Sequence, residues 1–452
     1  MRTFVLLAVL AILPVFAGAA RAADGDLDPG WTTDAEFPGY GFYFGGFGVD
    51  KSDSVEAVLP AANGHTWLVG NVNSAPDSHR ISVYRLLPNS LADHAFGDAG
   101  QRTYVMPCEA GRVTDATLDR QQRLWILIGG CGDFLAYRLV ANGDLDTSLL
   151  GSGVLTIAFD LGGDLVDYAT RIAALDDGSV LIAGRAGAED PPRVLAVAHF
   201  DADGQPVAGF GDEGRATLAM SLSPSTSNGL HVMEDGRIVV TGYRLGNGNT
   251  HDEFVARLQP NGAVDAAFGA DGPGYSLYVP LAPPDGMSGT SGSSVLLEDG
   301  SVLRAGTRGG DFYLGRWKSD GQPDLTLGPL GLRTYALDFG DSLHDAARML
   351  LRQRDGRLLL VGESDGPDGF TGLSLLRLDA DYEPDPGFGD GGKLRYLAPI
   401  ASDGLHGMRA RTAVAVPGRI LVGADVATGP GQAQMQSVMA LESDLLFADD
   451  FD

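Results

Sequence analysis

The densest group of potential metal-binding side chains lies in one short segment, Asp341-Ser-Leu-His344-Asp345. Carboxylate and imidazole groups close together in a loop can bind a hard or borderline cation, so Asp341, His344 and Asp345 are the candidate metal ligands. Their spacing matches no defined metal-binding motif, and isolated aspartates and histidines are common on acidic protein surfaces. We therefore favour solvated loop charge over a metal site in this segment.

Three aspartates near the N-terminus alternate along the chain as they do in a calcium-binding loop: Asp24, Asp26 and Asp28. An EF-hand loop has glycine at its sixth position and glutamate at its twelfth, where this sequence has Pro29 and Ala35. The sequence thus predicts no resident cofactor. Calcium held by acidic loops, as in a calcium-dependent adhesin, is the alternative.

Motifs that mark common catalytic centres are missing from the sequence. It contains no His-Glu-x-x-His pair and no phosphate-binding Gly-Lys-Ser/Thr loop. Carboxylates are abundant, but a sequence does not show which two would face each other across a cleft. We therefore favour a binding or interaction module over an enzyme, with a glycan-acting hydrolase or lyase as the alternative.

An arginine followed eight residues later by an aspartate recurs along the chain. The five pairs are Arg85 with Asp93, Arg138 with Asp146, Arg257 with Asp265, Arg316 with Asp324, and Arg377 with Asp385. One further unit has His199 and Val207 at these positions, so both partners are lost together. This joint loss indicates a structural arginine–carboxylate pair that braces a turn, rather than a ring of substrate-binding arginines.

Residues 1–22 have the features of a secretory signal peptide, which predicts an exported protein, periplasmic or extracellular. Arg2 gives a charged start, the segment 5–16 is apolar, and Ala20-Arg-Ala22 supplies small residues for cleavage. The apolar segment is shorter than a helix that spans a bilayer, and no later segment is long and apolar enough to do so. We expect residues 23–452 to form a single domain without membrane insertion.

Cys108 and Cys131 are the only cysteines. An exported protein meets an oxidising compartment, where an even cysteine count fits one disulfide. We therefore predict a bond between them, with a pair of free buried thiols as the alternative.

The formal net charge of −27 narrows the classes of partner. A strongly acidic protein is repelled by the phosphate backbone, so we expect no nucleic-acid partner. Cations, basic proteins and neutral glycans are compatible with this charge. We expect a monomer that binds a protein or a glycan.

The elements that would position these residues come from a segment closed by glycine that recurs seven times. The copies span residues 64–70, 123–129, 178–184, 236–242, 300–306, 356–362 and 417–423. Their closing glycines stand 59, 55, 58, 64, 56 and 61 residues apart. A period of this length indicates an array of units that bury their apolar faces against one another.

Each unit has the pattern of a four-stranded antiparallel blade. In the third unit, four short apolar runs (171–175, 179–185, 194–200 and 215–220) are separated by Asp- and Gly-rich turns. No segment shows a sustained helical period. The predicted units span about 55–108, 113–163, 168–220, 226–281, 291–341, 345–400, and 406–452 together with 23–48.

The chain termini predict a closed ring. The seventh unit ends without the turn motif that marks the second half of the others, and that motif appears instead at Asp24-Gly-Asp-Leu-Asp28-Pro-Gly-Trp31. An N-terminal strand that completes the last blade removes two unpaired sheet edges, which an open solenoid would not achieve. The sequence therefore predicts an all-β, seven-bladed β-propeller.

The repeated motifs resemble those of the delta-60 repeat family of bacterial exported proteins, which combine a "DG.ilvaG" segment with a later "dG.lD..FG..G" segment. The resemblance covers nearly all of residues 23–452 and implies a β-propeller-like repeat without an established activity. This sequence departs from the pattern at Arg120-Gln-Gln-Arg123, where the turn glycine is missing, and at Val207.

A blade of this kind places the loop between its second and third strands on the same face as the connection to the next blade. Cys108 and Cys131 then lie on that face in adjacent blades, where a disulfide is feasible. Loops on a rigid scaffold commonly hold binding sites, so we expect a partner to bind on this face. Its polar residues are His79, Asp133, Asp164, Asp167, His251, Asp252, Asp341, His344, Asp345, Asp365, Asp368, Asp403 and His406.

Overall fold

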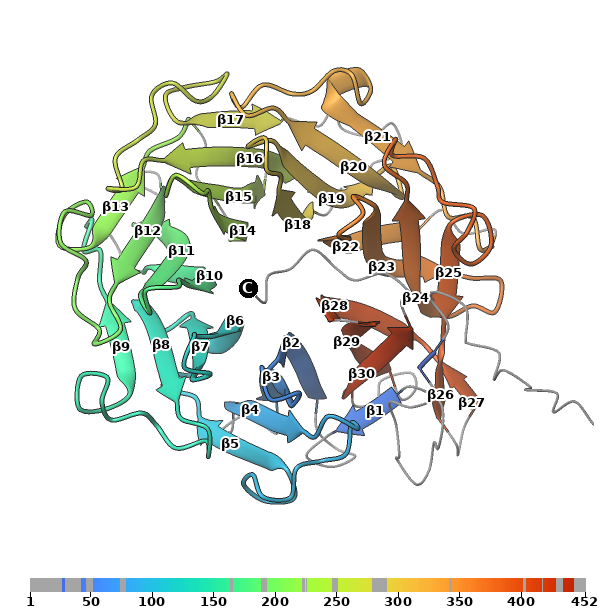
Figure 1. Cartoon of the computed structure of the whole chain (residues 1–452), viewed down its shortest axis with the longest axis horizontal. Coiled ribbons are helices and arrows are strands. Elements are labelled where there is room, and N and C mark those ends of the chain that lie inside the picture. Colours follow the sequence, from blue (N-terminus) through green and yellow to red (C-terminus); the bar gives the residue numbers. More distant parts are fainter. Residues whose placement is uncertain are drawn as a thin grey trace, which may run out of the picture.

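Seven four-stranded antiparallel sheets surround a central axis, as predicted (Figure 1). The computed structural model describes residues 27–28, 42–45, 52–73, 79–162, 166–187, 193–221, 224, 226–245, 251–278, 291–340, 344–400, 404–416, 418–427 and 434–442. The predicted signal peptide, Asp24, Asp26 and Asp341 lie outside these residues.

Blades 1–6 each take four consecutive strands, ordered along the chain from the axis outward (Figure 1). Blade 1 contains β2 (Ser52–Pro60), β3 (Thr66–Asn73), β4 (His79–Leu86) and β5 (Gln101–Val105). Blade 2 contains β6 (Arg112–Leu118), β7 (Leu124–Gly129), β8 (Phe134–Leu139) and β9 (Val154–Ile157). Blade 3 contains β10 (Tyr168–Ala174), β11 (Val180–Ala186), β12 (Val194–Phe200) and β13 (Arg215–Leu218).

The second half of the ring follows the same plan. Blade 4 contains β14 (Thr226–Val232), β15 (Ile238–Leu245), β16 (His251–Leu258) and β17 (Tyr275–Tyr278). Blade 5 contains β18 (Ser291–Leu296), β19 (Val302–Arg308), β20 (Asp311–Trp317) and β21 (Leu332–Tyr335). Blade 6 contains β22 (Asp345–Arg352), β23 (Leu358–Asp365), β24 (Thr371–Leu378) and β25 (Lys393–Tyr396), and a short hairpin of β26 (Ala398–Ile400) and β27 (Gly404–His406) follows it.

Blade 7 joins the two ends of the chain. Its strands β28 (Met408–Val416), β29 (Arg419–Ala427) and β30 (Gln434–Glu442) are completed on the outside by β1 (Phe42–Gly45), which pairs antiparallel with β30. A bridge from Leu27 to Leu441 and a hydrogen bond from Asp28 N to Ala440 O (3.0 Å) extend this pairing. The predicted closure by the N-terminal segment is therefore confirmed.

The hydrophobic core lies between blades. Each of the seven blade boundaries has its own cluster of buried residues; Trp67 and Val69 of blade 1, for example, share a cluster with Leu124 and Ile126 of blade 2. Burial of one such side chain contributes about 1.5–3 kcal/mol. A single blade exposes these faces, so the ring must close for the chain to bury them.

Two blades differ in register from the repeated glycine pattern. In blades 1, 3, 4, 5 and 6 the closing glycine pairs with the residue before a bulge in the inner strand, as Gly70 does with Val55. Ile128 takes this place in blade 2 and Ala424 in blade 7. Gly129 and Gly423 thus lie one residue away from the position that the closing glycine takes in the other five blades.

Strands account for almost all regular structure in the described ranges, which contain one 3-10 turn (Pro329–Gly331) and no α-helix. None of the described residues belongs to a helix with the length and hydropathy needed to cross a membrane.

Candidate functional site

The two faces of the ring carry different features. We call the face with the second-to-third-strand loops and the blade connections the loop face, and the face with the hairpin turns the turn face. The seven inner strands contact their neighbours around the axis. All seven have a bulge near the loop face, which leaves extra residues outside the regular pairing: Glu56, Thr114, Thr170, Asn228, Gly292, Ser293, Arg348 and Arg411. Bulges of this kind re-aim side chains and are frequent beside functional sites.

Two arginines from neighbouring blades meet at Tyr168, at the loop-face ends of β6, β10 and β11. The guanidinium carbons of Arg185 and Arg112 lie 4.6 Å and 5.4 Å from the centroid of the Tyr168 ring. Arg112 Nε also donates a hydrogen bond to the Tyr168 hydroxyl, and Arg112 forms no ion pair with a carboxylate in the described part of the chain. Burial lowers the pKa of Arg185, and the like charges of Arg193 and Arg112 lower it further.

A second tyrosine connects this group to the other side of the axis. Burial raises the pKa of Tyr243 in blade 4, and the positive charges of Arg348, Arg171, Arg112 and Arg185 oppose that shift. Four arginines on four strands of blades 2, 3 and 6 therefore act on one phenol. We call Arg112, Arg171, Arg185, Arg348, Tyr168 and Tyr243 the axial arginine cluster.

Carboxylates lie near the axis in blades 2, 6, 7 and 1. Burial raises the pKa of Asp115 on β6 of blade 2, and the charge of Arg171 opposes that shift. Arg348 Nη2 donates to Glu363 Oε1 (2.8 Å), and Arg411 Nε donates to Asp425 Oδ2 (2.5 Å). Although burial opposes its charge, the pKa of Arg411 is raised by Asp425, Glu56 and Glu363. Burial raises the pKa of Asp425 to about 6, but the Asp425 side chain is only 1% exposed, so substrate would not reach it as a general acid.

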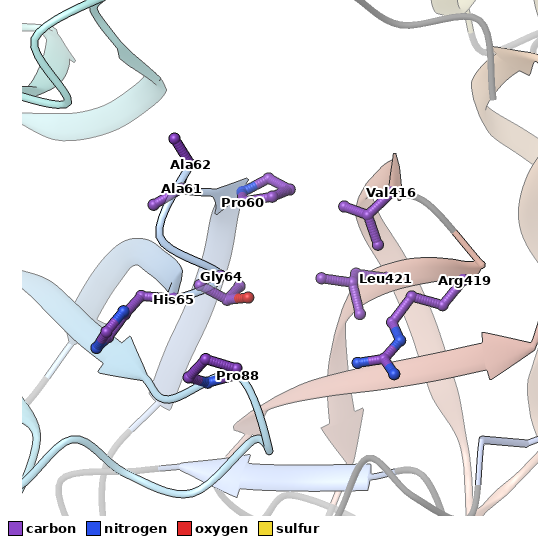
Figure 2. A pocket seen from close by; sticks show the side chains of 10 residues that line it. Pro60, Ala61, Ala62, Gly64, His65, Pro88, Val416, Arg419 and Leu421 are labelled. Carbon is purple, nitrogen blue, oxygen red and sulfur yellow. The ribbon is translucent and has the colours of Figure 1, made fainter. Parts of the chain in front are cut away.

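The turn face has a cavity of about 570 Å³ at the boundary between blades 7 and 1. Figure 2 shows Pro60, Gly64 and Pro88 of blade 1 facing Val416, Leu421 and Arg419 of blade 7 across it. The lining is mainly apolar, with Arg419 and His65 as its basic groups. Each of these has a carboxylate neighbour: Arg419 Nη2 lies 2.9 Å from Asp28 Oδ2, and His65 Nε2 lies 3.4 Å from Asp93 Oδ2.

The arginines and aspartates spaced eight residues apart meet on the turn face. The Nε–Oδ2 distances are 2.7 Å (Arg85–Asp93), 2.7 Å (Arg138–Asp146), 2.6 Å (Arg257–Asp265), 3.5 Å (Arg316–Asp324) and 2.9 Å (Arg377–Asp385). In blade 3, His199 Nε2 lies 2.9 Å from Ser179 Oγ instead. These are contacts within a blade, and we call them the turn-face braces.

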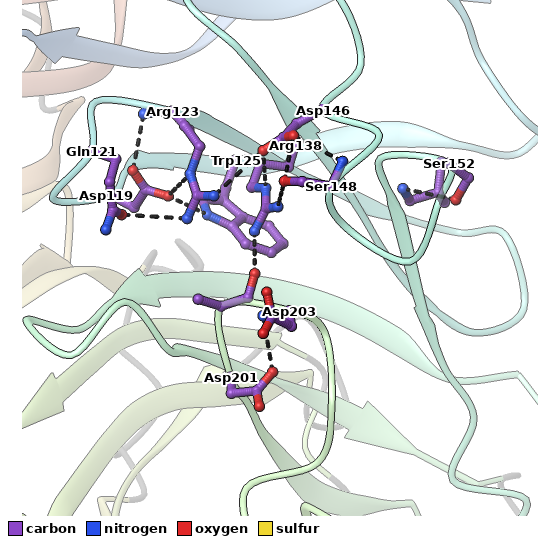
Figure 3. A network of polar contacts seen from close by, with 12 residues as sticks. Asp119, Gln121, Arg123, Trp125, Arg138, Asp146, Ser148, Ser152, Asp201 and Asp203 are labelled. Atoms are coloured by element: carbon purple, nitrogen blue, oxygen red, sulfur yellow. Dashed lines mark hydrogen bonds and ion pairs between the residues drawn. The ribbon is translucent and has the colours of Figure 1, made fainter.

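Figure 3 shows the brace of blade 2 in detail. Arg138 is fully buried, lies 5.1 Å above the Trp125 ring, and shares Asp146 with Arg123, whose Nη1 is 3.4 Å from Oδ2. Arg138 Nη1 also donates to the carbonyl of Ala202 in blade 3. Arg85 reaches Ala141 O and Arg257 reaches Ser319 O in the same way, so the brace also joins neighbouring blades.

Cys108 and Cys131 form a disulfide on the loop face, with their sulfurs 2.05 Å apart. Cys108 follows blade 1, and Cys131 lies in the loop between β7 and β8 of blade 2. The bond closes a span of 23 residues next to the start of β6, which carries Arg112.

Two of the three candidate metal ligands, His344 and Asp345, lie in the described residues. His344 is exposed, and the buried Asp345 carboxylate accepts a hydrogen bond from Leu337 N (2.9 Å). Asp167 anchors the equivalent connection through Phe159 N (2.8 Å). The described part of the chain contains no group of three His, Cys, Asp or Glu residues that could hold a metal ion.

Other loop-face residues also serve the scaffold. Asp368 accepts from Arg395 at 2.8 and 2.9 Å, and Asp365 accepts from Thr371 Oγ1 at 2.7 Å. Asp252 is buried in β16. Asp164, Asp341 and Asp403 lie outside the described residues, as do the side chains of His251 and His406.

Sequence reasoning missed the axial arginine cluster. Its residues occupy several different places in the repeat, so no fixed spacing relates them. A signal does exist in the inner strands, where the bulge position holds Glu56, Arg348 and Arg411 in some blades and small residues in others. Comparison of this one position across the seven units would have drawn attention to the axis.

Comparison with known protein families gives a partial match. A family model described as a domain of unknown function (DUF5122) beta-propeller matches residues 234–268 and 353–388. The match agrees with a propeller repeat family and does not establish the delta-60 name. No curated protein matches the chain.

Solved structures with a similar course of the chain include two lyases and a hydrolase. A streptogramin B lyase structure has a TM-score of 0.46 and 11% identity over 88% of this chain and 98% of that one. A virginiamycin B lyase from Staphylococcus aureus gives 0.45 and 10% over 87% and 99%. A puromycin hydrolase gives 0.49 and 14% over 88% of this chain and 55% of that one. Similarity at this level says nothing about the activity of the present chain.

Proposed function

We propose that this chain is an exported binding module that holds an acidic glycan at the axial arginine cluster on its loop face. The observation that carries the proposal is the meeting of Arg112 and Arg185, from two blades, at Tyr168. Export is supported by the signal-peptide features of residues 1–22.

The electrostatics of the cluster favour an anionic ligand. Arg112 and Arg185 both lie against the Tyr168 ring, and the like charges of Arg193 and Arg112 add to the effect of burial in lowering the pKa of Arg185. Holding such charges together costs free energy, and a bound carboxylate or sulfate relieves that cost through charge-assisted hydrogen bonds. Arginine is well suited to this because its planar fork can bind both oxygens of one anionic group.

The tyrosines favour a sugar as the carrier of that anionic group. Tyr168 and Tyr243 are only partly buried, and their phenol hydroxyls lie beside the arginines, where they can hydrogen-bond to the hydroxyls of a sugar. The net charge of −27 favours basic or neutral partners when averaged over the whole molecule. The axial arginine cluster is a local exception, so anion binding there would not arise from general attraction.

Binding of defined glycans tests the proposal. Titration calorimetry with alginate oligosaccharides (carboxylated), dextran sulfate oligosaccharides and neutral dextran oligosaccharides would separate charge from sugar recognition. We expect one or both acidic glycans to bind and neutral dextran not to bind. Because the contacts are ionic, affinity should fall as salt rises.

Two double variants give the matched comparison. Arg112→Gln with Arg185→Gln should weaken binding at least about 10-fold, since each charge-assisted hydrogen bond contributes about 1.5–3 kcal/mol. Arg120→Gln with Arg354→Gln removes the same charge away from the axis and should leave affinity unchanged. Equal weakening by both pairs, or no binding of either acidic glycan, would overturn the proposal.

A further inference from the structure

The cavity between blades 7 and 1 lies where the repeat places a guanidinium elsewhere in the ring. The aspartate of each brace donates its backbone N–H to the third-strand arginine, as Asp93 N does to Arg85 O (2.9 Å) and Asp146 N to Arg138 O (2.8 Å). In blade 7 the same hydrogen bond runs from Asp28 N to Ala440 O (3.0 Å). Ala440 thus occupies the position of the repeated arginine.

The aspartate carboxylate at this position contacts two arginines in several blades. In blades 2, 4 and 6 one aspartate faces both the third-strand arginine and a second arginine from the first hairpin turn: Arg123 at 3.4 Å, Arg237 at 3.7 Å and Arg357 at 3.1 Å. In blade 7, Arg419 corresponds to that second arginine and lies 2.9 Å from Asp28. The place of the first arginine holds a methyl group.

The opposite wall of the cavity contains the residue that corresponds to the carbonyl acceptor of the brace arginine at other blade boundaries. At three other boundaries the arginine donates to the second residue of the next blade's turn: Ala141, Ala202 and Ser319. The equivalent residue of blade 1 is Pro88, because Leu87 N pairs with Leu91 O as Val140 N pairs with Asp144 O. Pro88 lines the cavity opposite Leu421 and Arg419 (Figure 2).

We propose that the cavity between blades 7 and 1 binds the side chain of an arginine supplied by a partner protein or peptide. That guanidinium lies between Leu421 and Pro88 and approaches the Asp28 carboxylate beside Arg419, as the chain's own arginines do in blades 2, 4 and 6. The volume of about 570 Å³ also admits residues that flank the arginine. The net charge of −27 favours a basic partner.

The basic groups already at the cavity do not prevent this. Arg419 faces Asp28 and His65 faces Asp93, so each has a neighbouring carboxylate. The paired arginines of blades 2, 4 and 6 show that this fold holds two guanidinium groups on one carboxylate.

Calorimetry with N-acetyl-L-arginine methylamide tests the proposal, with the citrulline analogue as its uncharged isostere and the lysine analogue as a second cation. A ligand of this size should bind with a dissociation constant on the order of 0.1–1 mM. We expect one site per chain, with citrulline at least about 10-fold weaker because it lacks the charge-assisted bonds. Equal binding of the arginine and citrulline compounds would assign the cavity to an apolar ligand and overturn the proposal.

Variants at one position complete the test. Ala440→Arg restores the repeated residue and should abolish binding of the arginine compound while raising the urea midpoint. Ala440→Leu also fills the cavity, and should abolish binding without that rise. Unchanged binding in both variants would overturn the proposal. Should either variant fail to fold, Asp28→Asn decides, because loss of the carboxylate should weaken arginine binding about 10-fold or more.

Discussion

Arginine has two different uses on the two faces of this ring. On the turn face, arginines stand at one repeated position, and each meets an aspartate of its own blade. In the axial arginine cluster they stand at different positions, and Arg112 and Arg185 meet a tyrosine and each other's charge. A residue that follows the repeat thus stabilises every blade in the same way, whereas departure from the repeat marks what is particular to this chain.

The same reasoning applies within the turn face. The braces of blades 1, 2 and 4 reach across to the next blade, and the boundary between blades 7 and 1 has Ala440 at the corresponding place. A cavity lies at this boundary. Blade 7 is also the blade in which two distant parts of the chain pair. The blade that lacks the repeated arginine is therefore the one that is assembled from both ends of the chain.

Removal of a buried brace should have the largest effect on stability. Arg138→Ala leaves the Asp146 carboxylate without its closest guanidinium and empties space above Trp125. Loss of one partner from a buried ion pair costs about 3–5 kcal/mol. Urea unfolding followed by tryptophan fluorescence should show a much lower midpoint.

The contrasting substitution lies at the axis. Arg112→Ala removes an exposed arginine and should change the free energy of unfolding by no more than about 0.5 kcal/mol. If the two variants unfolded at similar urea concentrations, the proposed division between scaffold and binding arginines would be wrong.

The disulfide should have the next largest effect, this time on the loop face. Replacement of both Cys108 and Cys131 by serine releases a span of 23 residues. Loop-closure entropy for a span of that length corresponds to about 3 kcal/mol. We expect the reduced protein and the double variant to unfold at similar urea concentrations, and the oxidised protein to unfold at a clearly higher one. A double variant as stable as the oxidised protein would contradict the prediction.

Acid should remove a stabilising contribution of Asp146 on the turn face. Near the axis, acid should have the opposite effect at Asp425 and favour the fold. Although burial opposes ionisation of Asp146, hydrogen bonds from Ser148 and the charges of Arg138 and Arg123 lower its pKa. A carboxyl with a lowered pKa stabilises the fold above its unfolded pKa of about 3.9, and that contribution is lost as the pH falls further. Burial raises the pKa of Asp425 to about 6, so ionisation of Asp425 disfavours the fold as the pH rises from about 4 to about 6.

Two asparagine variants separate these contributions. We expect the urea midpoint of Asp146→Asn to lie below that of the unmodified protein at neutral pH, and the two to converge in acid. The stability of Asp425→Asn relative to the unmodified protein should rise as the pH increases from about 4 to about 6, because only the unmodified protein ionises this carboxyl. A common pH profile for the two variants would contradict the distinction between the two faces.

The fold follows from the sequence because it depends on features that every unit repeats. Turn glycines and β-branched runs recur along the chain and predict the blades, and the split seventh unit predicts their closure. The axial arginine cluster depends on single residues of separate blades. Arg112 begins a strand, Arg185 is the penultimate residue of another, and Arg348 occupies a bulge. No local pattern joins them, because their proximity arises only when the ring closes.

Relief of backbone strain at Ser90 should have the smallest effect on the free energy of unfolding. It also tests whether a change on the turn face leaves the axis unaffected. Ser90 lies in a turn of blade 1 with φ of 70°, where the corresponding turns of blades 2, 3, 4 and 5 have Gly143, Gly204, Gly262 and Gly321. An L-residue in this conformation costs about 1–2 kcal/mol, partly offset by the greater chain entropy of glycine. Ser90→Gly should therefore stabilise the protein by about 0.5–1 kcal/mol, measured by urea unfolding.

The neighbouring substitution Asn89→Gly is the matched control. Asn89 does not have a positive φ, and its Oδ1 accepts a hydrogen bond from Leu91 N (3.3 Å). Glycine there adds chain entropy to the unfolded state and loses this bond, so it should destabilise the protein slightly. Restoring the repeat at Ser90 should leave glycan binding at the axis unchanged, since the turn lies on the opposite face. A gain in stability accompanied by a loss of glycan binding would mean that the two faces are coupled, and the separate uses of arginine would then need a common explanation.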